Sequence, residues 1–219
     1  MRPSRIIDLS EALYHNCPSN PAFPPCEVST KMLHPVSGWC TEELCLFTHV
    51  GTHVDAPYHR FPTGVRLDKI PLDRLVCQAV CVAADEIDPG APIGVEVLDE
   101  RAERLEPGDA LLLRTGWGDK RANTEEYLYR SPWLSQEVAE WAVARGLAGV
   151  GIDHFSVGGA QPQNAAIPHD ILLGAGLWVA EGLYIPPELT QMGSFLLVVA
   201  PLLITDASGA PARVLALVD

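Results

Sequence analysis

The feature that most constrains this chain is a short segment in which three of its seven histidines fall within eleven residues, together with a carboxylate. The segment reads His49-Val-Gly-Thr-His53-Val-Asp55-Ala-Pro-Tyr-His59. At about 3.3 Å per residue, a straight strand from His49 to Asp55 would span roughly 20 Å, too far for both side chains to reach one ion. The chain must therefore bend here, and Gly51 supplies a backbone that can turn. Pro57, which lacks an amide donor, likewise argues against a continuous central strand.

Imidazole and carboxylate groups at this density indicate a metal site. They are the nitrogen and oxygen ligands that zinc and neighbouring divalent metals accept, and three protein ligands leave a position open for water. A structural zinc site normally recruits thiolates instead. A lone histidine is more often a surface or satisfied core residue, but the clustering favours ligation. We expect a divalent metal, with zinc favoured by the number of histidines and manganese also suited to these ligands.

The composition predicts one folded domain that covers residues 1–219. Hydrophobic residues make up 47% of the chain and charged residues 20%, which is an ordinary globular balance rather than the signature of disorder. The formal net charge is −13, and Lys and Arg form no cluster. Because phosphate binding draws its affinity from a basic surface, nucleic acid is not an expected partner.

The sequence favours a cytoplasmic protein without a membrane partner. Met1 to Asp8 lack the apolar run of a signal peptide. The longest apolar stretch, Phe195 to Ile204, is far shorter than the roughly 20 residues of a membrane helix. The six cysteines form no C-x-x-C pair, so we expect reduced, mostly packed thiols. Cys77 and Cys81 would share one face of a strand.

Apolar periodicity predicts a mixed α/β fold in which strands outnumber helices. A helix is expected from Gln136 to Arg145, with Ser135 as its N-cap and Gly146 at its C-terminal stop. A second helix is expected from Val95 to Leu105, and the proline-rich stretch Pro18 to Pro25 must be loop. Strands are expected at Glu43 to Phe47, Val76 to Ala84, Ala110 to Arg114, Ala148 to Ile152, Leu177 to Ala180, Phe195 to Ile204 and Ala212 to Val218.

The histidine-rich segment matches the motif H-x-G-T-H-x-D-x-P-x-H without a gap. In this it resembles the cyclase family, which includes bacterial kynurenine formamidases and isatin hydrolases. The resemblance extends over nearly the whole chain, through Ile7-Asp8-Leu9-Ser10, Leu112-Leu-Arg-Thr-Gly-Trp117, Gly151-Ile-Asp-His-Phe-Ser156, His169 and Glu181. It implies a swivelling β/β/α fold, a homodimer or homotetramer, and hydrolysis of amide bonds in small aromatic or cyclic compounds.

The resemblance also implies a ligand set for one or two ions per chain and no other cofactor. His49, His53 and Asp55 would hold the first ion. His169 and Glu181 would complete a second site, with Asp55 bridging both ions. From the residues alone, His169 is expected on a loop after a proline, and Glu181 closes a buried apolar run where a salt bridge would explain it. The resemblance to the family favours metal ligation over a loop position for His169 and over a salt bridge for Glu181.

His59 is the expected acid/base of a hydrolase. Water activated as hydroxide at the metal would attack an amide or formamide carbonyl. His59, which titrates near neutrality, would take the proton from water or deliver it to the departing nitrogen. The alternative roles for His59 are a further metal ligand or a group that orients one.

The substrate is expected to be a small molecule, with an aryl formamide as the first choice. The chain departs from formamidases of the family at Phe23-Pro24-Pro25-Cys26, where they usually carry Trp-Pro-Gly-Asp, and at His154-Phe155, where they favour Thr-Pro. Hydrolysis of another cyclic amide, imide or lactone, as in isatin hydrolases, is therefore the alternative. A metal-dependent isomerase or dehydratase and a non-catalytic metal-binding module also stay open.

Three further side chains have less defined roles. Phe23 and Trp117 are candidates for substrate binding, with Trp117 placed to stack on an aromatic ring, although a tryptophan is more often simply part of the core. For His154, a buried hydrogen-bonded position is favoured over a role as pocket acid/base.

Overall fold

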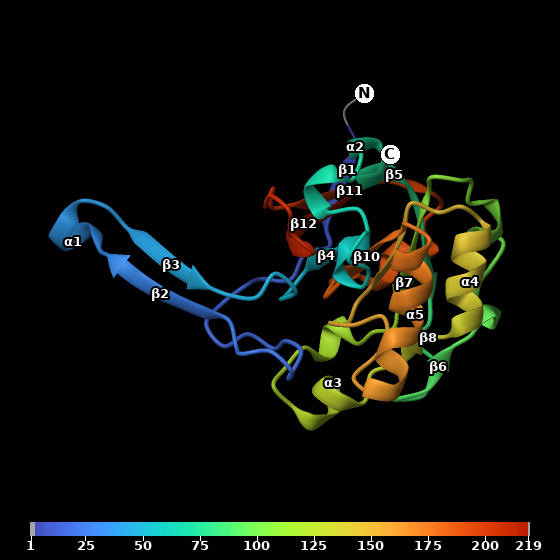
Figure 1. Cartoon of the computed structure of the whole chain (residues 1–219), viewed down its shortest axis with the longest axis horizontal. Coiled ribbons are helices and arrows are strands. Elements are labelled where there is room, and N and C mark those ends of the chain that lie inside the picture. Colours follow the sequence, from blue (N-terminus) through green and yellow to red (C-terminus); the bar gives the residue numbers. More distant parts are fainter. Residues whose placement is uncertain (1–2, 219) are drawn as a thin grey trace.

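A sheet of eight strands, in the order β1-β12-β11-β5-β7-β9-β10-β4, dominates the computed structural model, which describes residues 3–218. Residues 1–2 and 219 of the expected domain lie outside the described residues. Strand β12 also pairs with β4, which closes the sheet into a barrel (Figure 1). The strands of this sheet are β1 (Arg5–Asp8), β4 (His53–Asp55), β5 (Val76–Ala83), β7 (Ala110–Arg114), β9 (Gly149–Ile152), β10 (Trp178–Glu181), β11 (Phe195–Pro201) and β12 (Gly209–Val218).

The barrel is mixed in strand direction. Strands β5, β7, β9 and β10 are parallel to one another, whereas β11, β12 and β4 pair with their neighbours in antiparallel fashion. The sequences of the parallel strands are mostly apolar because both faces of these strands are covered. One face fills the barrel, where Cys77 and Cys81 lie in the same core cluster as expected. The other face packs against α4 (Gln136–Ala144) and α5 (Pro162–Gly174), which confirms the expected α/β class.

Helix α4 confirms the sequence prediction almost to the residue. The Ser135 hydroxyl accepts a hydrogen bond from the backbone N–H of Val138 at 3.3 Å, as an N-cap should. Gly146, just past the helix, has a φ of +71°, which suits glycine at a C-terminal stop. Six of the seven expected strands also lie in the barrel sheet, with ends that differ by up to three residues.

The helix expected from Val95 to Leu105 is wrong. The segment forms two separate 3-10 turns, Val95–Val97 and Ala102–Arg104. Between them the Asp99 carboxylate accepts hydrogen bonds from the backbone N–H groups of Arg101 at 2.9 Å and Ala102 at 3.3 Å. This side chain therefore starts a new turn instead of letting a helix continue, which is how aspartate competes with helical hydrogen bonding.

His169 lies within helix α5 and not on the loop expected after Pro168. The proline lacks an amide hydrogen and removes one helical hydrogen bond, yet the helix continues past it to Gly174. Packing explains this tolerance, because Leu172 and Leu173 on the following turn are buried against the sheet. Burial of this helix against the sheet therefore outweighs the helix-breaking tendency of Pro168.

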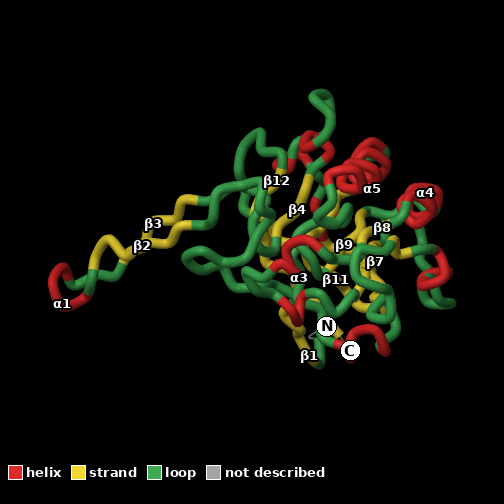
Figure 2. Tube along the Cα trace, turned by 90° about the horizontal axis from the view of Figure 1, so that it is seen from below, coloured by secondary structure: helices red, strands yellow, loops and turns green. Residues whose placement is uncertain are grey.

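A hairpin arm projects from the barrel (Figures 1 and 2). We define this arm as β2 (Glu27–Met32), β3 (Thr41–Cys45) and the short helix α1 (His34–Ser37) at its tip. The strand expected at Glu43 to Phe47 is thus shifted to β3 and lies in the arm, with all five of its residues exposed. Its sequence, Thr-Glu-Glu-Leu-Cys, does not alternate polar and apolar residues and so supplies no apolar face that a core would accept.

The remaining α-helices and strands of the described residues are short: α2 (Leu72–Leu75), β6 (Pro92–Ile93), α3 (Glu125–Tyr129) and β8 (Trp133–Leu134). All six cysteines are free thiols, as expected. Within residues 3–218, no helix is both long enough and apolar enough to cross a bilayer.

Candidate metal centre

Strands β4 and β10 bring three ligand-type side chains onto one face of the barrel wall. His53 and Asp55 point the same way because side chains two apart in a strand share a face. Antiparallel pairing places Glu181 of β10 directly opposite His53. The intervening Val54 and Ala180 belong to the barrel core, so the three polar side chains project from the outer face.

The turn before β4 fixes the position of His49. Gly51 has a φ of +60°, which confirms the bend expected at this glycine. The hydroxyl of Thr52 donates a hydrogen bond to the carbonyl of Gly182, which ties the turn to the end of β10. A Cβ at Gly209 would lie 2.6 Å from the ring of His49, so that glycine leaves the room that the imidazole occupies.

Backbone hydrogen bonds orient two imidazoles. The Nδ1–H of His53 donates to the carbonyl of Gly51 at 2.9 Å, and the Nδ1–H of His169 donates to the carbonyl of Ala165 at 2.6 Å. In both rings this leaves Nε2 facing the carboxylates. Ligating histidines typically have one ring nitrogen held by a backbone carbonyl while the other faces the metal.

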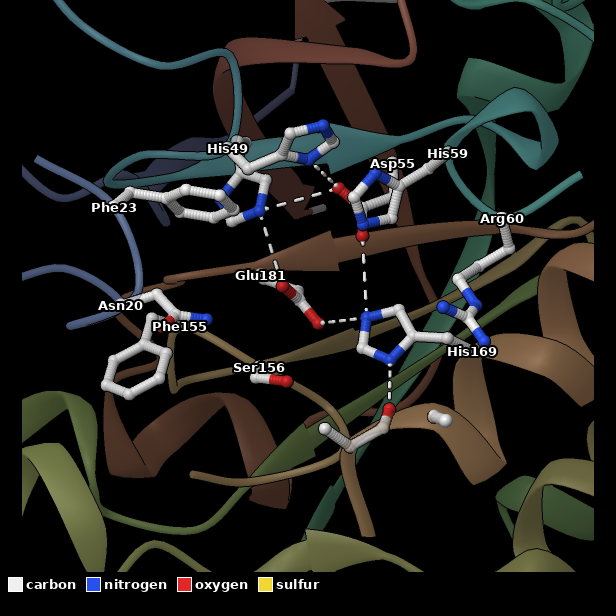
Figure 3. Close-up of a pocket in the computed structure, with 13 residues that line it drawn as sticks. Asn20, Phe23, His49, Asp55, His59, Arg60, Phe155, Ser156, His169 and Glu181 are labelled. Carbon is white, nitrogen blue, oxygen red and sulfur yellow. Dashed lines mark hydrogen bonds and ion pairs between the residues drawn. The ribbon is translucent and has the colours of Figure 1, made fainter. Parts of the chain in front are cut away.

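The five expected metal ligands meet around the two carboxylates (Figure 3). The Nε2 atom of His53 lies 3.5 Å from Asp55 Oδ1 and 3.3 Å from Glu181 Oε2. The Nε2 atom of His169 lies 3.5 Å from Asp55 Oδ2 and 3.1 Å from Glu181 Oε1. Nδ1 of His49 is 2.6 Å from Asp55 Oδ1. Each carboxylate therefore faces both the His53 side and the His169 side of the cluster.

Burial makes this cluster dependent on positive charge. Asp55 is 1% exposed and Glu181 is 3% exposed, and two neighbouring buried carboxylates are costly unless cations balance them. Burial opposes ionisation of Asp55, but hydrogen bonds from His169 and His49 outweigh it and hold its pKa well below the usual value. Burial and the charge of Asp55 likewise oppose ionisation of Glu181, yet His169 and His53 lower its pKa to about 2.

The two imidazoles respond in the opposite direction. Burial disfavours their charged forms, but the pKa of His53 is raised to about 8 by its hydrogen bond to Glu181 and by the charges of Asp55 and Glu181. The pKa of His169 is raised well above its usual value, because the same two carboxylates outweigh burial. The cluster is thus built around positive charge, and its nitrogen and carboxylate donors fit a divalent metal ion.

His59 closes the short 3-10 turn Pro57–His59 beside this cluster. Its ring centroid lies 4.0 Å from that of His49. Donor atoms come within 4.8 Å of one another in two groups, His49 with Asp55 and His59, and His53 with Asp55 and Glu181. The set expected for the first ion is therefore divided between these groups, and His59 is close enough to be a ligand.

The protonation state of His59 differs from that of the other imidazoles. Burial lowers its pKa below the usual value, and the positive charges of His49 and His169 lower it further, although Asp55 acts in the opposite direction. At neutral pH the ring is therefore uncharged and can accept a proton.

A cavity of about 360 Å³ lies over the cluster, a size suited to a small molecule. Phe23 and Phe155 contribute aromatic surface, and Phe23 is stacked on Phe47 with ring centroids 5.0 Å apart. The proline-rich loop expected at Pro18 to Pro25 thus brings Phe23 to the cavity, where the sequence prediction placed it. Asn20, Arg60 and Ser156 add polar groups.

Trp117 and His154 lie behind the cavity wall. Trp117 is buried with Tyr127 and Phe155, and its indole N–H donates to the Tyr127 carbonyl at 3.2 Å, so it supports Phe155 and does not line the cavity. His154 is fully buried and its Nε2–H donates to the same carbonyl at 3.1 Å. This confirms the expected buried, hydrogen-bonded histidine, and burial lowers its pKa to about 4, so the ring is uncharged at neutral pH.

Several contacts at the site have no sequence signal. The Ser208 hydroxyl lies 3.0 Å from Nε2 of His49, and the backbone N–H of Val157 donates to Glu181 at 2.7 Å. These groups come from loops that only the barrel topology brings to the site. Arg60 also lines the cavity and was not predicted to do so. Its position directly after His59 is a sequence signal that could have suggested it.

A comparison with protein-family models matches residues 7–158, more than half of the chain, to a family described as "Putative cyclase". The chain belongs to this cyclase family. The kynurenine formamidase of Bacillus cytotoxicus is 27% identical over 214 residues, which cover 97% of each chain. The kynurenine formamidase of Bacillus cereus is also 27% identical, with the same coverage.

Solved structures agree with this family assignment. Isatin hydrolase A from Labrenzia aggregata, bound to benzyl benzoate, matches with a TM-score of 0.84 at 27% identity and covers 98% of this chain and 93% of its own. Isatin hydrolase A from Ralstonia solanacearum matches with a TM-score of 0.81 at 25% identity and covers 98% and 92%. The resemblance seen in the sequence is confirmed, and so is the expected class of metal-dependent hydrolase.

Proposed function

We propose that this cyclase-family chain, as one domain, hydrolyses the amide bond of a small aryl formamide at a divalent metal centre. The observation that carries the proposal is the pair of buried carboxylates, Asp55 and Glu181, set between His53 and His169 on the floor of a cavity. Relatives named kynurenine formamidase over 97% of the chain support the aryl formamide as substrate class.

The ligand assignment keeps the set that the family resemblance implies, although the donor atoms of His49 and His53 fall in separate groups. We propose that His49, His53 and Asp55 would hold the first ion, and that His169 and Glu181, with Asp55 shared, would hold a second. Zinc is the favoured metal because imidazole is so abundant in the site, and manganese suits the same donors. A divalent ion held there supplies a Lewis acid for the substrate carbonyl and lowers the pKa of water.

His59 handles the protons in this proposal. It is uncharged at neutral pH and lies against the cluster, so it can accept a proton from the attacking water. The protonated ring can then deliver that proton to the departing aryl nitrogen, which otherwise leaves poorly. Phe23 and Phe155 flank the cavity and hold the aryl ring, and they also restrict the access of bulk water.

Opening of a cyclic amide is the second candidate. It is supported by the match to isatin hydrolase A from Labrenzia aggregata, with a TM-score of 0.84 over 98% of this chain. The same residues would act on a ring carbonyl, and the departing nitrogen would stay attached to the product. The two candidates differ in whether formate is released.

We also propose a cytoplasmic homodimer or homotetramer. The arm supports an oligomer, because its tip carries Leu33, Val36 and Trp39 with exposed fractions of 55%, 90% and 71%. Apolar side chains gathered on a projecting two-stranded hairpin are costly in water, since such a hairpin has little stability by itself. A second copy of the chain would cover them.

The test is product analysis on metal-loaded protein in water enriched in ¹⁸O. N-formylkynurenine, isatin and simple cyclic imides form the substrate panel. An aryl formamidase releases formate that carries one ¹⁸O atom, whereas a cyclic amidase gives a single ring-opened product with the label. Conversion without incorporation of the label would indicate an isomerase or dehydratase and would overturn the proposal. Binding of metal without turnover of any substrate would leave only a binding module.

A further inference from the structure

We propose that Ser208 is a positioning residue of the metal centre, which holds the imidazole of His49 so that Nδ1, and not Nε2, binds the ion. The inference rests on the proposed metal centre but not on the proposed substrate. It is carried by two contacts at opposite sides of one ring and by the way in which the barrel closes.

The ring of His49 is held at both of its nitrogen atoms. Nδ1 lies 2.6 Å from Oδ1 of Asp55, a contact that Figure 3 marks. Nε2 lies 3.0 Å from the hydroxyl of Ser208. Because the two nitrogens of an imidazole point in different directions, Nδ1 is turned towards Asp55 and Nε2 is turned away from it. In a ligating histidine, the nitrogen that a neighbouring group holds is not the one that binds the metal.

This arrangement is the reverse of that in the other two histidines of the proposed centre. In His53 and His169, Nδ1 is held by a backbone carbonyl and Nε2 faces the carboxylates. A carbonyl oxygen can only accept a hydrogen bond, whereas a hydroxyl can both donate and accept. Ser208 can therefore keep its contact with His49 when Nε2 carries the proton, as metal binding at Nδ1 requires, and also when it does not.

Closure of the barrel places Ser208 beside the ring. Ser208 directly precedes β12, and its carbonyl accepts a hydrogen bond from the N–H of Ala56 at 2.9 Å. The next residue, Gly209, is paired with Asp55 of β4. The backbone at the serine is thus tied to the strand that carries the ligands, which fixes the point from which its hydroxyl reaches His49.

A purely structural role explains less of this arrangement. Within residues 3–218, the hydroxyl of Ser208 has no hydrogen-bond partner other than His49, so it supports neither a turn nor a strand. The hydroxyl of Ser10, by comparison, donates to the carbonyl of Val214 at 3.3 Å and accepts from its N–H at 2.8 Å. Both serines are partly buried and adjoin β12, but of the two only Ser208 bonds to a proposed ligand. Ser10 therefore supplies a matched control.

The first test measures zinc affinity, by competition with a chelating dye, in the wild-type protein and three variants. Loss of a group that orients a ligating histidine typically weakens metal binding, and we expect a loss of roughly 10- to 100-fold in Ser208→Ala. Ser208→Thr keeps the hydroxyl and should restore most of the affinity. Ser10→Ala should bind zinc as the wild-type protein does, although it loses its hydrogen bonds to β12.

The second test identifies the nitrogen that binds the ion. Long-range ¹H–¹⁵N NMR spectra of zinc-saturated protein, labelled with ¹⁵N at histidine, distinguish the two ring nitrogens. We expect one zinc-bound imidazole to coordinate through Nδ1. Its Nε2–H, which Ser208 holds in the wild-type protein, should exchange with water faster in Ser208→Ala than in Ser10→Ala.

Zinc-bound imidazoles that all coordinate through Nε2 would overturn the proposal. So would a zinc affinity that is unchanged in Ser208→Ala, or that falls equally in Ser208→Thr or in Ser10→Ala. Failure of the proposed metal centre gives a different result, namely no zinc bound by the wild-type protein, and that result would refute the role of Ser208 as well. Neither measurement requires turnover of a substrate.

Discussion

Replacing Gly182 by alanine is predicted to damage both the fold and the metal centre. Gly182 directly follows Glu181 and has a φ of +64°, a left-handed conformation that costs an alanine about 1–2 kcal/mol. An added Cβ would lie 2.2 Å from the carbonyl oxygen of Gly51 and 2.7 Å from its carbonyl carbon. Backbone atoms in this turn cannot move aside easily, and overpacking of this kind costs about 1–3 kcal/mol. The free energy of unfolding should therefore fall by about 2–5 kcal/mol.

Gly176→Ala is the matched control for this prediction. Gly176 precedes β10 and has a φ of +85°, but a Cβ there would meet nothing within 4 Å. Urea unfolding of both metal-free variants gives their free energies of unfolding. Both variants carry the cost of a positive φ, but only Gly182→Ala carries the steric clash, so the difference between them measures the clash. Because the clash pushes the turn before His53 away from β10, Gly182→Ala should also bind zinc more weakly than the control. If the two variants lie within about 0.5 kcal/mol of each other and bind zinc equally, the account of this junction is wrong.

Three further predictions concern protons, metal and assembly. His59→Asn should retain its metal and lose roughly 10²- to 10⁴-fold in kcat, and a fall in activity only in proportion to lost metal would make His59 a ligand. Since the pKa values of His53 and His169 are raised without metal and a ligand must be unprotonated, zinc affinity in a competition titration should rise at least about tenfold per pH unit from pH 6 to 8. A flat profile would contradict the protonated cluster. Trp39→Glu at the tip of the arm should lower the mass measured by light scattering without loss of fold, and an unchanged oligomer would place the interface elsewhere.

The sequence predicted the local part of the site well. His49, His53, Asp55 and His59 are close in the chain, and Gly51 turns the backbone between them as its conformational freedom suggested. His169 and Glu181 were reached only through the family resemblance. Their approach to Asp55 depends on the pairing of β10 with β4 and on the packing of α5, neither of which leaves a pattern in the local sequence.

Non-local structure also explains the errors in the fold. Strand β4 spans only His53–Asp55, too short for its alternation to be recognised, yet its pairing with β12 closes the barrel. The apolar spacing from Val95 to Leu105 suggested a helix because it does not reveal that Asp99 starts a new turn. In α5 the opposite happened, since burial of the helix outweighed the helix-breaking tendency of Pro168.

The most direct test of the central claim is a titration of metal-free protein with zinc that records formate release from N-formylkynurenine together with ions bound per chain. The metal-free protein should be inactive, and activity should rise in step with occupancy of the site and be abolished by chelation. Asp55→Asn, which removes the shared carboxylate but keeps its shape, should bind fewer ions and show no turnover at any zinc concentration. Turnover by chelated protein, or full occupancy and activity in Asp55→Asn, would contradict the assignment of this cluster as the catalytic metal centre.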